Sequence, residues 1–243
     1  MRIWKIVLVH ILLLVFGYTK AQLYIGAEAG YSNNYSNTDI SSTVLTKNQN
    51  GGGYTAGIVT KYEYKKGISI KSGIFLLQKN YFFLRTGDYT GVYTGFKNTY
   101  IQVPATIQIK LLSRKKIEAY ISAGGFGGYW AFGKIYGAMP NIFSSYENRI
   151  DNSGQGAQYL SLTKYSEKYQ FNTIKDNRIE LGSILGIGAN FSLKGKCLAF
   201  VECKYFHSLT DQQKKYMLFQ TKKFNQTISV SLGILYNLTR KIP

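Results

Sequence analysis

The sequence predicts an all-β fold class: an eight-stranded antiparallel up-and-down transmembrane β-barrel with short periplasmic turns and long extracellular loops. Apolar residues recur at every second position in eight segments, which is the period of a strand with one apolar face. The connections between these segments alternate strictly between long and short, as in barrels that span an outer membrane. Charged residues inside the segments all fall out of phase with the apolar ones. An even number of strands places both ends of the domain on the side of the short turns.

The eight segments follow one another between residues 22 and 238. They are expected near 22–32, 53–64, 68–79, 99–112, 117–130, 179–191, 197–208 and 226–238. Their apolar phases begin at Leu23, Tyr54, Ile68, Ile101, Ile117, Ile179, Cys197 and Ile228, in that order. The fourth segment is the clearest, because apolar residues alternate without a break from Ile101 to Leu111.

The connections distinguish the two ends of the barrel. Only "KKG" (65–67), "SRKK" (113–116) and "KGK" (194–196) are short. The four other links are long, and the third, at about 131–177, is by far the longest. Within it, "QYLSLTKYSEKYQF" (158–171) leaves open an extra hairpin, which would raise the strand count to ten.

The first 21 residues have the layout of a secretory signal peptide. Arg2 and Lys5 form a basic start, Ile6–Tyr18 is apolar, and "YTKAQ" offers a cleavage site after Ala21. The apolar run is shorter than the roughly 20 residues that a membrane-spanning helix needs. We therefore expect export, cleavage, and a barrel domain at 22–243 in the outer membrane of a Gram-negative-type bacterium.

Charged residues predict an ion-pair network inside the barrel. The predicted luminal set is Glu28, Lys61, Glu63, Lys71, Lys110, Glu118, Arg178, Glu180, Glu202 and Lys204. Five are positive and five negative, and an isolated charge inside a barrel would be costly, so we expect them to pair. Lys110 and Glu118 flank one turn and form the best single candidate for a luminal salt bridge. Eight strands leave an interior that side chains fill, which disfavours a porin.

Alternation alone does not say which face lies outside, so a secreted soluble barrel of the lipocalin kind is the main alternative. Three features favour the membrane. The charges are sparse for a surface that faces water. Aromatic rings lie near strand ends on the apolar face, as in an interfacial girdle. The loops at the two ends are very unequal.

The net charge of +18 raises nucleic-acid binding as a function, but its distribution argues against it. Strand charges cancel, and basic residues gather at the short turns. The predicted periplasmic basic rim consists of Lys65, Lys66, Arg114, Lys115, Lys116, Lys194 and Lys196, followed by Arg240 and Lys241 near the C-terminus. Such a rim suits anionic lipid head groups or an acidic periplasmic partner.

Three glycines stand out in "IELGSILGIGANF" (179–191). Charged and polar residues at 178–190 exclude a membrane helix, and a phosphate-binding loop is disfavoured because no further glycine or following helix completes the motif. On a strand, Gly182, Gly186 and Gly188 share the inward phase. Gly186 and Gly188 are expected opposite Lys204 and Glu202, where they would give the charged side chains room.

Catalytic and metal-binding patterns are weak. His207 and Ser208 are adjacent on a strand and therefore point to opposite faces, so we expect no Ser–His pair. Cys197 and Cys203 lie too far apart on one strand to form a disulfide and are interpreted as small apolar side chains. The interior carboxylates each lie near a lysine or arginine, which indicates ion pairs rather than acid–base catalysis. We expect no catalytic residues, cofactor or metal.

The strand sequences resemble those of PorT-like outer-membrane β-barrel proteins. The similarity covers "LYIGAEAGYS" (23–32), "NTYIQVPATIQIKL" (98–111), "AYISAGGFGGYW" (119–130), "IELGSILGIGANF" (179–191), "ECKYFHSLTD" (202–211) and "TISVSLGILYNL" (227–238). The chain departs from the pattern at its end, "YNLTRKIP" (236–243), where many barrels finish on an aromatic residue, and in its long third link. The resemblance implies an eight-stranded barrel of unspecified activity, some relatives being linked to protein secretion.

We therefore predict an integral outer-membrane protein with a side-chain-filled lumen and a non-enzymatic structural or interaction role carried by its extracellular loops. Its expected partner is outer-membrane lipid, with lipopolysaccharide, at the basic loop 210–223, or a periplasmic protein as further candidates. The alternatives are a secretion-accessory barrel, a lipid-modifying enzyme and a secreted soluble ligand-binding barrel. The sequence leaves the oligomeric state open.

Overall fold

A computed structural model describes residues 22–40, 43–65, 67–114, 116–150, 156–193 and 195–239. The predicted signal peptide lies outside the described residues. No helix in the described ranges is long and apolar enough to cross a membrane. The strands of the barrel and its extensions are β1 (Gln22–Thr38), β2 (Thr46–Lys65), β3 (Ile68–Gln78), β4 (Asn80–Arg85), β5 (Tyr93–Arg114), β6 (Ile117–Pro140), β10 (Ile179–Ser192), β11 (Cys197–Ser208) and β12 (Lys223–Asn237).

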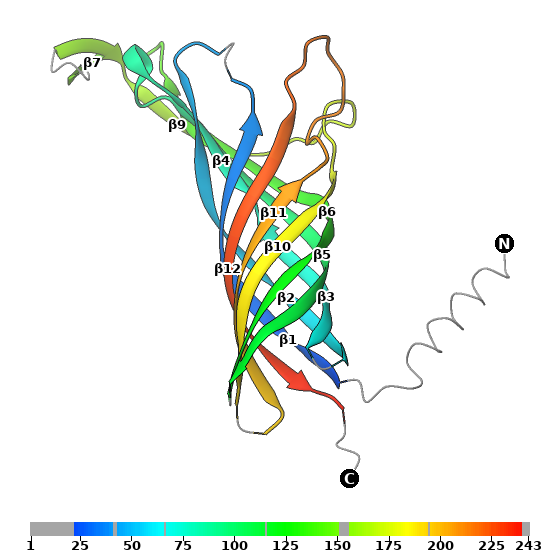
Figure 1. Ribbon diagram of the computed structural model, residues 1–243. Helices are drawn as coiled ribbons and strands as arrows, with labels where there is room; N and C mark the ends of the chain where they lie inside the picture. Colours follow the sequence, from blue (N-terminus) through cyan, green and yellow to red (C-terminus); the bar gives the residue numbers. More distant parts are fainter. Residues whose placement is uncertain are drawn as a thin grey trace.

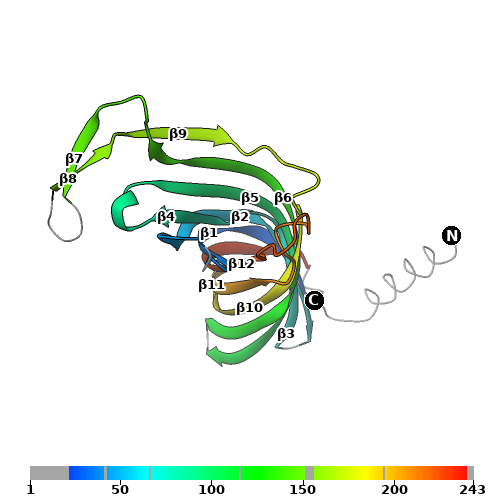
Figure 2. The same cartoon turned by 90° about the horizontal axis from the view of Figure 1, so that it is seen from above.

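Eight of these strands close into a ring. The pairing runs β1–β2–β3–β5–β6–β10–β11–β12 and returns to β1, and every neighbouring pair is antiparallel. Strand β4 continues β3 after Lys79 and pairs with β2 and β5 above it. The predicted eight-stranded barrel is confirmed, and its strands tilt around a common axis (Figures 1 and 2).

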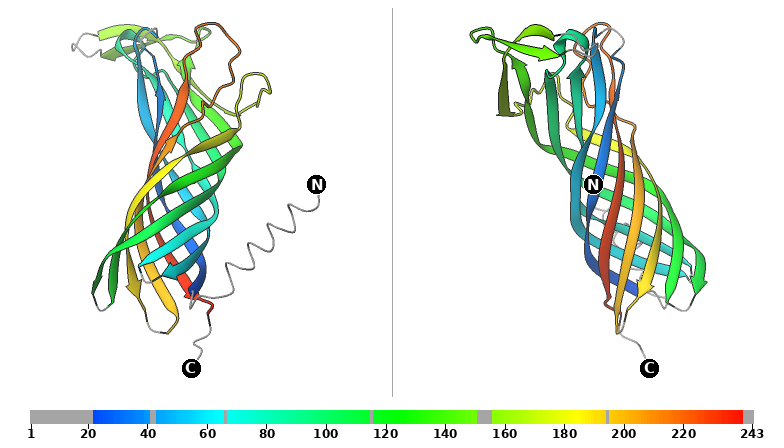
Figure 3. Two further views of the ribbon diagram at one scale, coloured as in Figure 1. Left: turned by 45° about the vertical axis from the view of Figure 1, so that its right-hand side comes forward. Right: turned by 90° about the vertical axis from the view of Figure 1, so that its left-hand side faces the viewer.

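The third loop does not add strands to the ring. Strands β7 (Tyr146–Ile150) and β8 (Gly156–Leu160) pair with each other as a separate sheet. Strand β9 (Leu162–Lys168) pairs with β6 only above the point where β6 leaves β10. The upper parts of β2, β4, β5 and β6, together with β9, form a wall that rises on one side of the barrel mouth (Figures 1 and 3).

The two ends differ as the connection lengths predict. The short turns contain Gly67 and Gly195, whose φ angles of 98° and 77° favour glycine. The start of β1 and the end of β12 lie at this turn end (Figure 1). At the opposite end the strands run further than expected, to Thr38 in β1 and Pro140 in β6. These extensions pair without strict apolar alternation, because a sheet beyond the membrane can expose polar side chains on both faces.

Burial decides which face lies outside. On β5, Ile101, Val103 and Ile107 are 40–54% exposed, whereas Gln102 and Gln108 are at most 3% exposed. The other ring strands repeat the outward apolar phase, and their inward side chains are mostly polar or charged. Two buried apolar clusters, one that includes Val59 and Phe200 and one that includes Phe126 and Ile184, also lie inside the ring. A lipocalin-like barrel has the reverse arrangement. A continuous apolar outer surface is stable in lipid and costly in water, so this geometry is that of a membrane barrel.

Candidate functional site

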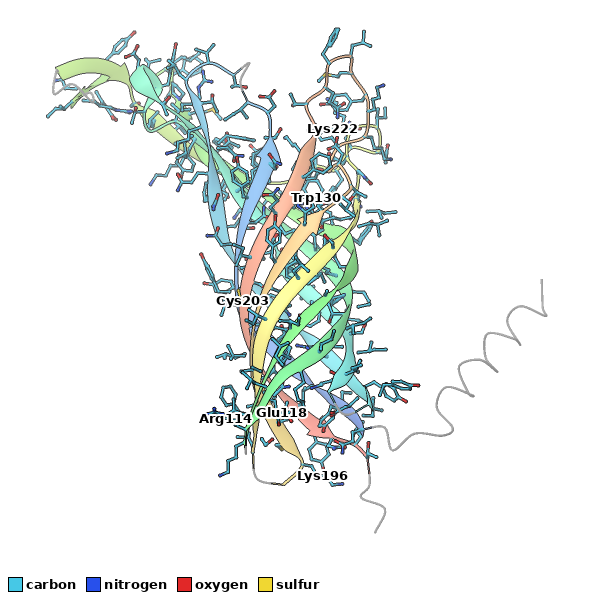
Figure 4. All side chains as sticks on the ribbon, in the orientation of Figure 1. Arg114, Glu118, Trp130, Lys196, Cys203 and Lys222 are labelled. Carbon is cyan, nitrogen blue, oxygen red and sulfur yellow. The ribbon has the colours of Figure 1, made fainter. Side chains whose placement is uncertain are left out.

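The lumen holds charged residues at three levels, of which the lowest lies near the short turns. The structure brings Lys110 and Glu118 into an ion pair at this level, and their side chains are about a quarter exposed. Glu118 lies near the turn end of the barrel in Figure 4. Lys61 and Glu63 line a cleft of about 10 Å³ together with Lys110. Lys61 and Glu63 form no ion pair with another described residue. The Lys61 ammonium lies 5.9 Å from the centroid of the Tyr24 ring.

The middle level is a ring of four charges that we call the central ion ring. Its members are Glu28, Lys71, Glu202 and Lys204. The Lys71 ammonium lies 2.9 Å from Glu28 Oε2 and 2.6 Å from Glu202 Oε2. Lys204 contacts the same two carboxylates. All four side chains are at most 8% exposed, so the two cations and two anions neutralise one another out of contact with water.

Hydroxyl groups and rings complete the central ion ring. Ser231 donates a 2.6 Å hydrogen bond to Glu28 Oε1, and Ser122 donates to Glu202 Oε1 at 3.2 Å. The Lys71 ammonium lies 3.9 Å from the centroid of the Phe200 ring, a cation–π distance. These contacts come from β1, β3, β6, β11 and β12, so the ring ties together strands that are distant in sequence.

The upper level is the Lys79–Glu180 pair, which sequence reasoning missed in part. Lys79 is completely buried and its ammonium lies 2.7 Å from Glu180 Oε2. Asn225 donates to the other oxygen of Glu180 at 3.2 Å. Lys79 is the last residue of the segment expected near 68–79 and is absent from the predicted luminal set. Its inward phase, eight positions after Lys71, was the available signal.

Above this pair, aromatic side chains close the lumen. Tyr100 stacks on Trp130 with centroids 6.0 Å apart, and its hydroxyl accepts a hydrogen bond from Gln212 at 3.2 Å. Tyr169, in the link after β9, lies against Trp130 and donates to Asp176 at 2.8 Å. Burial, together with this hydrogen bond, raises the pKa of the Tyr169 hydroxyl above its usual value. We call this group the aromatic cap; Trp130 stands near the upper end of the barrel in Figure 4.

Arg178 does not belong to the luminal network, contrary to the sequence-based expectation. Its guanidinium donates to the carbonyl of Trp130 at 3.0 Å and lies 4.5 Å from the Tyr129 ring and 4.0 Å from the Phe171 ring. Arg178 precedes the first residue of β10, where the chain leaves the barrel wall. The alternation that places a side chain inward no longer applies there, and the aromatic rings hold the guanidinium instead.

The three glycines lie on the inward phase, as expected, but two of them make room for aromatic rings rather than for charged side chains. In register, Gly186 faces Lys204 and Gly188 faces Glu202. A Cβ at Gly188 would nevertheless lie 2.5 Å from the Tyr120 ring, and one at Gly182 would lie 2.5 Å from the Phe126 ring. Only at Gly186 is a luminal lysine among the nearest groups, beside Ser122. The narrow lumen of an eight-stranded barrel accepts a ring where the neighbouring strand carries no side chain.

These contacts leave the interior packed. Two clefts between luminal side chains have volumes of about 10 Å³ each, about the size of one water, and a third, of about 30 Å³, lies at the aromatic cap. Four carboxylates, those of Glu28, Glu118, Glu180 and Glu202, each contact a lysine ammonium. Each of these carboxylates is held in an ion pair, which suits a structural network rather than proton transfer.

His207 and Ser208 lie on opposite faces of β11. Ser208 is buried and its hydroxyl donates to the carbonyl of Thr210, whereas His207 Nδ1 lies 3.4 Å from the Tyr205 hydroxyl on the outer face. Cys197 and Cys203 are free thiols, and Cys203 lies on the outside of the barrel wall (Figure 4). These residues do not assemble a nucleophile and base.

The basic rim is described in part. Arg114, Lys116 and Lys196 are exposed at the turn end, and Arg114 and Lys196 can be followed in Figure 4. The backbone of Lys65 ends β2, while Lys66, Lys115 and Lys194 lie outside the described residues, as do Arg240 and Lys241.

The loop end carries a cleft that sequence reasoning did not find. Its volume is about 350 Å³, within the range of small-molecule sites. Arg85 from β4 and Lys223 from β12 supply positive charge, Asp39 supplies negative charge, and Phe83 and Tyr93 supply rings. The lining comes from four segments that are distant in sequence, so no local motif marks it. We call it the mouth cleft.

Comparisons with known proteins agree with this geometry. Residues 19–213 match the family described as outer membrane protein beta-barrel domain. Among solved structures, the chain resembles the outer membrane protein OprG from Pseudomonas aeruginosa, with 11% identity, 91% of this chain and 98% of that chain covered, and a TM-score of 0.47. Neisserial surface protein A (NspA) shows 9% identity, coverage of 90% and 100%, and a TM-score of 0.45.

The outer membrane protease OmpT from Escherichia coli shows 8% identity, coverage of 90% and 96%, and a TM-score of 0.41. No curated protein matches the chain. The family match covers most of the sequence, including seven of the eight ring strands in full. The chain therefore belongs to the outer membrane protein β-barrel domain family and is an outer-membrane β-barrel protein of the kind found in Gram-negative bacteria.

Proposed function

We propose that this protein is a closed, non-enzymatic outer-membrane barrel whose specificity resides in its extracellular loops. One observation carries the proposal: ion pairs occupy the lumen at three levels and the aromatic cap covers the highest of them. Passage of a solute would require breaking the central ion ring and the Lys79–Glu180 pair, both inaccessible to water. Leaving one buried charge without its partner costs about 3–5 kcal/mol.

The loop end, unlike the packed lumen, offers a projecting wall and an open cleft. The wall formed by β2, β4, β5, β6 and β9 rises beyond the ring, and the mouth cleft opens between β4, β5, β12 and the first loop. A rigid barrel that holds variable loops above the membrane is a general arrangement for recognition. This supports an interaction role at the cell surface.

Conductance in planar lipid bilayers tests the closed lumen. The full-length protein is expected to give no current above that of the empty bilayer. A variant with K79A and E180A, which removes the upper pair without leaving an unpaired charge, should also give no discrete current, because the central ion ring still closes the lumen. Discrete porin-like conductance of the unchanged protein would contradict the proposal.

We call residues 141–161, which contain β7 and β8, the crown, and its removal tests the interaction role. A variant in which residues 141–161 are replaced by a short turn keeps every ring strand. We expect it to remain heat-modifiable in detergent gels, as a folded barrel is, and to fail to restore the phenotype of a strain that lacks the protein. Full restoration would show that the third loop is dispensable for function.

The second candidate is the secretion-accessory role that the PorT-like resemblance implies. The exposed Arg114, Lys116 and Lys196 at the turn end support it, because a basic surface there faces the periplasm. Charge reversal of these three residues should reduce secretion and capture of a periplasmic partner. Unchanged secretion and capture would count against this role.

Export and the enzyme alternative have separate tests. Cleavage after Ala21 predicts that N-terminal sequencing of the protein from outer membranes begins at Gln22. Retention of residues 1–21 in that fraction would exclude a cleaved signal. For the lipid-modifying alternative, His207→Ala is the direct test, since any such activity that survives the substitution does not depend on that histidine.

A further inference from the structure

The loop between β11 and β12 ends in an apolar tip. Met217, Leu218 and Phe219 follow one another, and Leu218 and Phe219 are 85% and fully exposed. Phe219 has a φ of 56°, in the left-handed region that aromatic residues rarely adopt. Consecutive large apolar side chains in full contact with solvent are costly and mark a surface that is covered during function.

The loop beneath the tip is braced. The side chain of Gln220 accepts a hydrogen bond from the Tyr216 amide at 3.0 Å and donates to the Lys214 carbonyl at 3.0 Å. The Asp211 carboxylate accepts from the amides of Gln213 and Lys223. These bonds close the base of the loop, so the tip projects from a defined support.

A second segment holds the same loop from the side. Lys214 donates through its backbone amide to the Lys175 carbonyl and through its ammonium to the Thr173 carbonyl, both at 2.8 Å. Asp176 pairs with Gln213 as a β-bridge. The tip is therefore fixed to the link that follows β9 and, through Gln212 and Tyr100, to the aromatic cap.

Lysines occur before and after the tip along the loop and on the segment that braces it. Lys175, Lys214, Lys215 and Lys222 are all exposed, and Lys222 stands beside the loop in Figure 4. The two acids nearby are occupied: Asp176 is buried against Tyr169, and Asp211 binds backbone amides. We call these four residues the lysine collar. An apolar tip flanked by exposed lysines is complementary to an anionic surface with an apolar interior.

The tip stands well above the protein's own bilayer. The uppermost exposed apolar residue of β12 is Ile228, five positions from the first residue of the strand, Lys223. That length of strand measures about 17 Å along its own axis, or roughly 13 Å along the barrel axis at a tilt of about 40°, and the loop extends beyond it. Figure 1 shows this loop at the end of the molecule opposite the short turns. A surface that covers the tip therefore faces the barrel from outside.

We propose that the β11–β12 loop binds the surface of an opposing anionic lipid membrane, with Leu218 and Phe219 in the boundary of the acyl chains and the lysine collar on head-group phosphates. The proposal rests on the proposed function and names the partner class of one loop. Amphipathic surface binding combines apolar burial with attraction of basic residues to anionic lipid. Each lysine near such a surface strengthens binding about fivefold.

Vesicle flotation tests the proposal. The full-length protein in phosphatidylcholine nanodiscs is mixed with vesicles of phosphatidylcholine, with or without phosphatidylglycerol. We expect it to float with the vesicles that contain phosphatidylglycerol and to remain unbound to pure phosphatidylcholine. The variant L218S/F219N removes the branched side chain of Leu218 and the ring of Phe219, and asparagine tolerates the left-handed φ at 219. It should bind at least about tenfold more weakly.

Two further variants separate the contributions. K214E/K215E/K222E should abolish binding to phosphatidylglycerol vesicles. The matched control is I142S/F143S in the turn between β6 and β7, which carries exposed apolar residues in a segment, 141–150, without lysine. This control should bind as the unchanged protein does, and all variants should keep heat-modifiable migration.

Three results would overturn the proposal: no flotation of the unchanged protein, equal flotation with both vesicle types, or equal losses in the control and the tip variant. Absence of flotation together with absence of conductance would refute the lipid partner and leave the closed barrel intact. Flotation together with porin-like conductance would support the lipid partner and refute the closed barrel.

Discussion

Glu202→Gln is the sharpest test of the luminal network, because it removes one charge from the central ion ring and changes the side chain's shape very little. Lys71 lies 2.6 Å from Glu202 and 2.9 Å from Glu28, so after the substitution two ammonium groups share one carboxylate. The site then carries an uncompensated positive charge that water does not reach. The expected loss of unfolding free energy is about 3–5 kcal/mol.

The compensating variant restores neutrality. In E202Q/K71M the Lys204–Glu28 pair remains and the second cation is gone. We expect the double variant to regain at least half of the loss, because the penalty of an unpaired buried charge disappears. Glu118→Gln is the matched control. Its ion pair with Lys110 is about a quarter exposed, so its loss should cost under about 1 kcal/mol.

Urea unfolding in lipid vesicles measures these differences. Trp130 is the only tryptophan after residue 21, and it lies buried against Tyr100 in the aromatic cap. Its emission should shift to longer wavelength when the barrel opens. Equal midpoints and slopes for E202Q and E118Q would refute the argument. So would a double variant whose loss is the sum of the two single losses, since it would show that the charges act independently.

Three other predictions follow from the same geometry. Gly188→Ala should destabilise the barrel by about 1–3 kcal/mol, because its Cβ would lie 2.5 Å from the Tyr120 ring. Gly127→Ala is the control and should be tolerated, because its Cβ would have no neighbour closer than 3.7 Å. Equal unfolding midpoints for the two variants would contradict this prediction. Cys203 should resist a charged maleimide in intact membranes and react after unfolding, and rapid labelling in membranes would mean that this face meets water. Lys79→Met should lower the unfolding free energy by about 3–5 kcal/mol by leaving Glu180 unpaired, and a loss below 1 kcal/mol would show that the pair contributes little.

Much of the barrel wall could be predicted from the sequence. The alternation that starts at Ile101 places Gln102 and Gln108 inside, and the structure finds them buried. The short turns at 65–67 and 194–196 set the register of the hairpins around them, which placed Gly186 opposite Lys204. Both inferences depend on a period of two and on tight turns, which act between residues close in the chain.

The strand extensions and the crown were less predictable. Above the membrane, side chains on both faces of a strand can be polar without cost. The alternation of apolar and polar residues therefore ends at about residue 32 in β1 and residue 130 in β6. For the same reason, the sequence did not decide whether residues 158–171 form an extra hairpin of the ring. Pairing of β9 with the upper part of β6 was decided by where β10 begins, at Ile179.

The sequence by itself determined the number of ring strands, the inward phase of nine of the ten charged residues, and the two unlike ends, with basic residues in the short turns. The tertiary structure alone decided that the apolar face lies outside, that Glu28 on β1 meets Lys71 on β3 and Lys204 on β11, and that Arg178 leaves the lumen for aromatic rings. The physical reason is the difference in range. Side-chain direction follows from the backbone of a single strand, whereas a partner across the lumen depends on the closure and stagger of all eight.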